Sequence, residues 1–133
     1  MFKILEHGSD IMFEIYFTDI NSFFEQMAQA FRKVMVDFSP KGTMIVKNIT
    51  LKDGGEYSTN AIRYLNELIY IFDLEWLIPI KCIEIEKKNG NLIITMSMER
   101  IKEPGSLINI PKAATYSGGR TGNASPLRII IDI

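Results

Sequence analysis

The chain ends in LRIIIDI (residues 127–133), a run apolar enough to form a buried strand. Chain termini are usually frayed and polar, so this run predicts a closing strand that is tied into the core. Its aspartate, Asp132, is the last residue but one. A core strand that carries a carboxylate so close to its end requires an explanation.

A second predicted strand offers an explanation for the position of Asp132. Residues 10–17 alternate between polar and apolar side chains, and the strand that this predicts begins with Asp10. If it pairs antiparallel with the closing strand, Asp10 and Asp132 meet at one edge of the sheet. Two like charges are costly there unless a cation such as Ca²⁺ or Mg²⁺ joins them, and a terminal carboxylate on Ile133 would add oxygen ligands. The alternative is a solvated aspartate at a strand end, and the spacing leaves both interpretations open.

The remaining pattern predicts an α+β fold, with two helices packed on a mostly antiparallel β-sheet in one domain over residues 1–133. Asp19 and Ser22 are candidate helix caps, and Ser22 with Glu25 matches the capping-box pattern. Asn89-Gly90 predicts a tight hairpin turn. The expected helices cover residues 22–37 and 57–73; the expected strands cover residues 10–17, 43–51, 79–86, 92–98, 112–116 and 127–133, with a glycine-containing loop over residues 117–126.

Composition excludes several classes of protein. The formal net charge of −1 gives no overall basic field for binding nucleic acid directly. No apolar run approaches the roughly 20 residues that span a bilayer, and no secretion signal is evident, so we expect a cytoplasmic protein without membrane attachment. The single cysteine, Cys82, cannot form an internal disulfide, and its apolar surroundings predict a small buried side chain.

The sequence offers little for catalysis. It has one histidine, His7, and one cysteine, on different expected strands, so a zinc site is not expected. It contains neither of the common glycine-rich phosphate-binding motifs. We therefore expect a protein that is not an enzyme.

Three blocks of sequence resemble the archease family. The first is LEHGSDIMFEIY (residues 5–16), which is similar to the family's His-Thr-Ala-Asp opening strand and is followed by a helix of the family's type. The second is YLNELIYIFD (residues 64–73), similar to its Leu-Asn-Glu-Leu helix. The third is KAATYS (residues 112–117) with the closing strand, similar to its Lys-Ala-Val-Thr-Tyr-His segment and its terminal Asp-Ile.

The resemblance implies roles for particular residues. The family's metal ligands, which hold an ion assigned as calcium, fall on Asp10, Asp132 and Ile133. This implies a divalent cofactor, with Ca²⁺ expected and Mg²⁺ or Mn²⁺ as alternatives. A lysine associated with activity falls on Lys112, and the opening histidine falls on His7.

The sequence also departs from the family pattern. Gly8 and Ser9 replace the usual Thr and Ala of the opening motif. Ile108 to Pro111 replace Gly-Thr-Glu-Val before the lysine, and Ser117 replaces a frequent histidine.

The resemblance also implies a function. Archeases assist the RtcB-type RNA ligase of transfer-RNA splicing and RNA repair by promoting its guanylylation and multiple turnover. RNA would then be contacted only through the ligase. Two alternatives stay open: a general chaperone or protein-interaction module acting through exposed apolar surface, and a metal-dependent hydrolase with His7 as its base.

Overall fold

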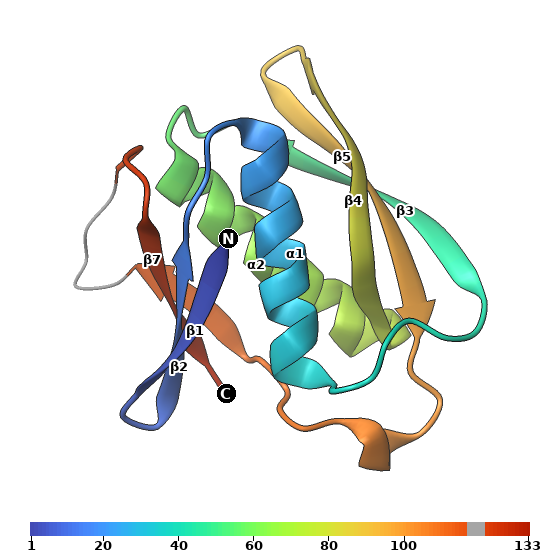
Figure 1. The fold of residues 1–133 in the computed structure, drawn as a ribbon. Coiled ribbons are helices and arrows are strands. Elements are labelled where there is room, and N and C mark those ends of the chain that lie inside the picture. The colour runs from blue at the N-terminus through green and yellow to red at the C-terminus, as the bar shows by residue number, and fades with distance from the viewer. Residues whose placement is uncertain (117–121) are drawn as a thin grey trace.

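The computed structural model describes residues 1–116 and 122–133, and Figure 1 shows how its elements are arranged. Along the chain they are β1 (Phe2–His7), β2 (Asp10–Ile15), α1 (Ile20–Met35), β3 (Met44–Lys52), α2 (Tyr57–Glu75), β4 (Leu77–Lys88), β5 (Asn91–Arg100), a 3-10 turn (Pro104–Ser106), β6 (Ala113–Tyr116) and β7 (Leu127–Asp132). Ser117 and the rest of the predicted loop up to residue 121 lie outside the described residues. In the described ranges, no helix has the length and apolar character to cross a membrane.

The strands form two antiparallel sheets, with the orders β1-β2-β7-β6 and β3-β5-β4. This arrangement, with two helices, confirms the predicted α+β class. The first strand, β1, was not expected, because the alternation of Phe2, Lys3 and Ile4 is broken by the apolar Leu5. A tight turn at Gly8, whose φ is +65°, joins β1 to β2.

Asp19 caps α1. The main-chain N–H of Ser22 donates to the Asp19 carboxylate at 2.7 Å. The expected capping box of Ser22 and Glu25 is therefore wrong, because the Glu25 carboxylate lies elsewhere and accepts from the main-chain N–H of Cys82 at 3.3 Å. The helix ends at Met35, two residues before the expected end.

Helix α1 contacts both sheets: β1 and β2 on one side, and β4 on the other (Figure 1). A helix placed in this way is apolar over much more than one face. Its fully buried side chains are Phe23, Phe24, Met27, Ala28, Ala30, Phe31 and Met35. These residues are the centre of the hydrophobic core.

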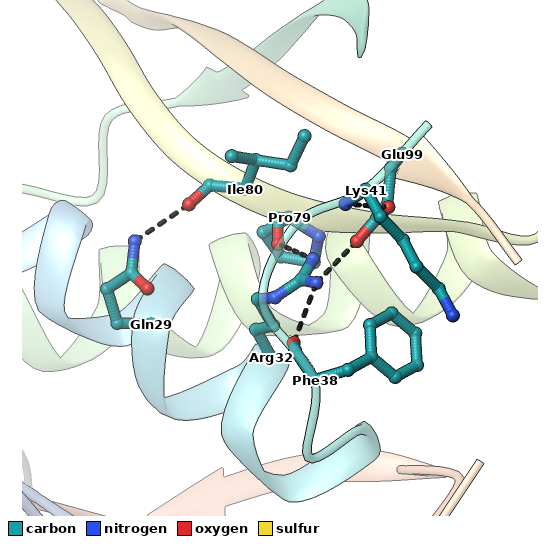
Figure 2. A network of polar contacts seen from close by, with 7 residues as sticks. All are labelled: Gln29, Arg32, Phe38, Lys41, Pro79, Ile80 and Glu99. Atoms are coloured by element: carbon teal, nitrogen blue, oxygen red, sulfur yellow. Dashed lines mark hydrogen bonds and ion pairs between the residues drawn. The ribbon is translucent and has the colours of Figure 1, made fainter. Parts of the chain in front are cut away.

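A polar stripe on α1, formed by Glu25, Gln29 and Arg32, covers one edge of β4. Among the described strands, β4 pairs only with β5, so no strand lies along this edge. Gln29 donates to the carbonyl of Ile80 at 2.7 Å, and Arg32 donates to the carbonyl of Pro79 at 3.1 Å (Figure 2). With Glu25, these side chains lie four and seven residues apart and so share one helix face. The helix thus satisfies main-chain groups that an open edge would leave for another chain.

Among the described residues, one ion pair is buried, and Arg32 forms it with the carboxylate of Glu99 at the end of β5. Both side chains are less than a tenth exposed. Arg32 donates further to the carbonyl of Phe38 at 3.1 Å, and the main-chain N–H of Lys41 donates to Glu99 at 3.0 Å (Figure 2). The network therefore ties α1, β5 and the loop after α1 together, with its charges compensated.

The β4–β5 hairpin confirms the predicted turn, because Asn89 and Gly90 both have positive φ, at 53° and 77°.

Cys82 on β4 is half-buried rather than fully buried. Its burial raises the pKa of the thiol to about 12, so the thiol stays protonated at neutral pH. The Tyr64 hydroxyl of α2 contacts the sulfur of Met96, the β5 residue that pairs with Cys82, at 3.1 Å.

Replacing Arg32 with methionine should destabilise the protein by about 3–5 kcal/mol, because it leaves the Glu99 carboxylate buried without its cation. The free energy of unfolding would be measured by urea denaturation. Lys33→Met is the matched control, since Lys33 is exposed on the same helix, and it should change that free energy by less than about 0.5 kcal/mol. Equal losses in the two variants would contradict this role of the ion pair.

Candidate metal centre

The register of β2 and β7 places two aspartates opposite each other. Ile11 lies opposite Ile131 in the last pair of the ladder. The next residue beyond this pair on each strand is Asp10 or Asp132. Opposite residues of an antiparallel pair point to the same face, with Cβ atoms about 5 Å apart. The antiparallel pairing on which the predicted meeting of Asp10 and Asp132 depends is therefore present.

The same strand pair carries a carboxylate that does have a cation. Glu14 lies opposite Arg128, and the arginine Nε donates to its carboxylate at 2.9 Å. The Tyr16 hydroxyl also donates to Glu14, and this bond, followed by Arg128, lowers the pKa of the Glu14 carboxyl. By contrast, within residues 1–116 and 122–133 no lysine or arginine forms an ion pair with Asp10 or Asp132. Among the described residues, these two carboxylates thus lie opposite each other on neighbouring strands without an ion-pair partner.

The other residues singled out from the sequence lie at the same edge. The main-chain N–H of Lys112 donates to the carbonyl of Asp132 at 2.7 Å, and the Lys112 side chain is exposed. His7 pairs with Asp10 across the β1–β2 turn, and its side chain lies outside what the structure describes. Ile133 follows β7 directly and packs partly buried against the core. The fold therefore brings all five positions to one end of the four-stranded sheet.

The donor set at this edge suits a hard cation. It consists of oxygen atoms from Asp10 and Asp132 with main-chain oxygens at the end of β7, and Ca²⁺ and Mg²⁺ prefer such ligands. In the described ranges, however, no three side chains of His, Cys, Asp or Glu gather into a metal-binding group. A cation here would therefore depend on main-chain oxygens and water for its remaining ligands.

Asn66 of α2 was not predicted to belong to this region. Its amide group donates to the carbonyl of Ala114 at 3.3 Å and accepts from the N–H of Ala114 at 2.9 Å. The side chain thus pairs with the outer edge of β6 as another strand would. Because β6 in turn pairs Ala113 with Asp132, Asn66 positions the strand next to the second of the two aspartates. The only sequence signal was its place within the Leu-Asn-Glu-Leu block.

Comparisons with known proteins identify the family. The model of the Archease protein family (MTH1598/TM1083) matches residues 2–133. The chain belongs to the archease family. This confirms the resemblance drawn from the three sequence blocks.

Individual archeases are similar over different lengths. The chain is 33% identical over 91 residues to the protein archease of Archaeoglobus fulgidus; this match covers 68% of this chain and 64% of that protein, just under two thirds of its length. It is 25% identical over 142 residues to the archease of Methanosarcina barkeri, covering 99% and 95%. The solution structure of protein 1598 of Methanobacterium thermoautotrophicum has the same fold, with a TM-score of 0.66, 23% identity and coverage of 99% and 98%.

The archease blocks, far apart in sequence, lie close together in the fold. The opening block forms β1 and β2, and the closing block forms β6 and β7 of the same sheet. The middle block forms α2, whose Asn66 bonds to Ala114 of the closing block. The candidate centre thus lies where the two end blocks pair, and the middle block supports it from the side.

Replacing Asn66 with alanine should cost about 1–3 kcal/mol, because two main-chain groups of β6 lose their partner. Hydrogen exchange at the Ala114 amide should accelerate more than exchange in the β3-β5-β4 sheet. Asp73→Ala, an exposed change on the same helix, serves as the control and should leave both sheets unchanged. Unaltered exchange at Ala114 in the Asn66 variant would show that the helix does not anchor β6.

Proposed function

We propose that this archease-family protein activates an RtcB-type RNA ligase, promoting its guanylylation and multiple turnover through a divalent cation held at the β2–β7 edge. Asp10, Asp132 and Ile133 would hold the cation, with Ca²⁺ expected first and Mg²⁺ or Mn²⁺ as alternatives. The observation that carries the proposal is the register of β2 and β7, which sets Asp10 opposite Asp132; neither forms an ion pair with a lysine or arginine among the described residues.

Within this proposal, the chain assists the reaction and catalyses none itself. A divalent cation supplies positive charge that offsets the two carboxylates and attracts phosphate oxygens. Lys112, whose backbone is hydrogen-bonded to Asp132, would bring its exposed ammonium to a phosphate at the ligase's nucleotide site. His7 would contribute from the adjoining turn. The ligase then contacts the RNA, and the protein acts in the cytoplasm.

A general interaction module is the second candidate function. Its support is the exposure of large apolar side chains, since Met44 and Val46 on β3 and Leu74 on α2 are each about 60% exposed. Suppressed aggregation of many unrelated proteins would favour this candidate, whereas dependence on one ligase would favour the first. A hydrolase using His7 as its base has no comparable support and would be excluded by inactivity on phosphoester substrates.

Replacing Asp132 with alanine should abolish stimulation of the ligase and leave the protein folded, since the side chain is exposed. RNA ligation by an RtcB-type ligase would be followed in single- and multiple-turnover assays with GTP and divalent metal. Wild-type protein should raise the number of turnovers, and Asp73→Ala, which changes an exposed carboxylate on α2, should act like wild type. Full stimulation by a folded Asp132 variant would contradict the proposal.

Replacing Asp10 with asparagine should weaken Ca²⁺ binding by at least about tenfold, because it removes one of the charged oxygen ligands. Calorimetric titration of metal-stripped protein would measure the affinity. Asp37→Asn, an exposed change beyond the end of α1, should leave it unchanged. If both variants bind Ca²⁺ as wild type does, the cation is held elsewhere.

A further inference from the structure

A pocket of about 510 Å³ lies near the C-terminal end of α1, away from the β2–β7 edge. It is formed by the loop after α1, the start of β3, the end of β5 and the segment that follows β5. The volume is that of a small-molecule site. The same segment continues past Ile108, whose N–H donates to the carbonyl of Met35 at 2.7 Å, before it reaches Lys112. The pocket and the candidate metal centre are therefore separate sites at two ends of one segment.

One part of the pocket lining is apolar. Phe38, Ile45 and Ile101 line it, and all three also contact the hydrophobic core. Side chains held by the core in this way keep their positions when a ligand arrives, so the lining is pre-formed. Ile101 is already buried, so an apolar ligand body gains free energy here by removing the exposed surface of Phe38 and Ile45 from water.

The polar part of the lining is cationic. Lys41 and Lys102 line the pocket, and within residues 1–116 and 122–133 neither forms an ion pair. Arg100 also borders it, but its guanidinium Nε donates to the carbonyl of Glu75 at the end of α2 at 3.1 Å. Glu99 also lines it, but its charge is compensated by Arg32 and by the Lys41 N–H. Among the described residues of the lining, Glu103 is the only other carboxylate. Two lysines thus accompany one uncompensated acid, and the excess positive charge favours an anion.

Lys41 is positioned for this role by the buried network. Its main-chain N–H is fixed on Glu99, and its ammonium lies 4.4 Å from the centre of the Phe38 ring. Figure 2 shows this side chain extending away from Glu99 and alongside the ring. An ammonium held over this ring can contact the charged group of a ligand whose body packs against the neighbouring apolar lining.

We propose that this pocket binds a small organic anion with a flat apolar body. The body packs against the exposed surface of Phe38 and Ile45, and the carboxylate or phosphate group is held by Lys41 and Lys102. The two head groups share this chemistry, so separate probes distinguish them. The proposal does not depend on the function assigned to the β2–β7 edge.

The test is an amide NMR titration of the full chain with 2-naphthoate, 1-naphthyl phosphate and the neutral 2-naphthylmethanol. The naphthyl anions should shift the amides of residues 38–45 and 99–106, and the neutral alcohol should bind at least about tenfold more weakly. The stronger of the two anions identifies the head group. Inorganic phosphate alone should bind more weakly than naphthyl phosphate, because it lacks the apolar body.

The double variant Lys41→Gln/Lys102→Gln should raise the dissociation constant of the better anion by about tenfold. Both side chains are exposed, and the main-chain bond of residue 41 to Glu99 is kept. The control, Lys81→Gln/Lys88→Gln, removes the same charge from exposed positions of β4 and should bind as wild type does. Equal weakening in both double variants, equal binding of the neutral alcohol, or shifts confined to other residues would overturn the proposal.

Discussion

The antiparallel pairing of β2 with β7 is the constraint on which the rest of the structure depends. It joins segments more than a hundred residues apart, so its loop-closure cost must be offset by burial of the shared core face, which includes Phe13 and Ile129. The same register fixes the outer face, where Glu14 faces Arg128 and Asp10 faces Asp132. Strand side chains alternate with a period of two. A shift of the β2–β7 register by one residue would therefore turn the apolar face outward and separate Glu14 from Arg128 and Asp10 from Asp132.

Helix α1 connects this sheet to the second one by two different means. Its apolar faces fill the core between the sheets, while its polar stripe bonds to the free edge of β4. Arg32 belongs to both the stripe and the ion pair with Glu99, and this network also shapes one wall of the pocket. A buried ion pair adds little net stability, but it strongly penalises arrangements that separate its partners. The network therefore specifies how helix, sheet and loop are placed relative to one another.

The sequence was sufficient where a local pattern carries the information. The alternation of β2, the apolar stripe of α2 and the Asn89-Gly90 turn predicted their elements, and the resemblance to archeases named the residues of the candidate centre, whose metal binding stays a prediction. Side-chain contacts between distant segments could not be predicted from local sequence patterns. Glu25 was expected to cap its own helix, yet it bonds to β4, and Asn66 gave no sign of its bond to β6. In both cases a polar side chain satisfies a strand edge that exists only after folding.

The central claim is that the end of the β2–β7 pair holds a divalent cation. Addition of substoichiometric Mn²⁺, which is paramagnetic, during amide NMR spectroscopy tests it most directly, because the ion broadens only the signals of nuclei close to it. A cation held there should selectively broaden the signals of Asp10, Ile11, Lys112, Ala113 and Asp132; excess Ca²⁺ should reverse this broadening, and the Asp132→Ala variant should not show it. Broadening centred instead on the acidic residues Asp19, Asp53 and Glu56, or spread evenly over the protein, would contradict it.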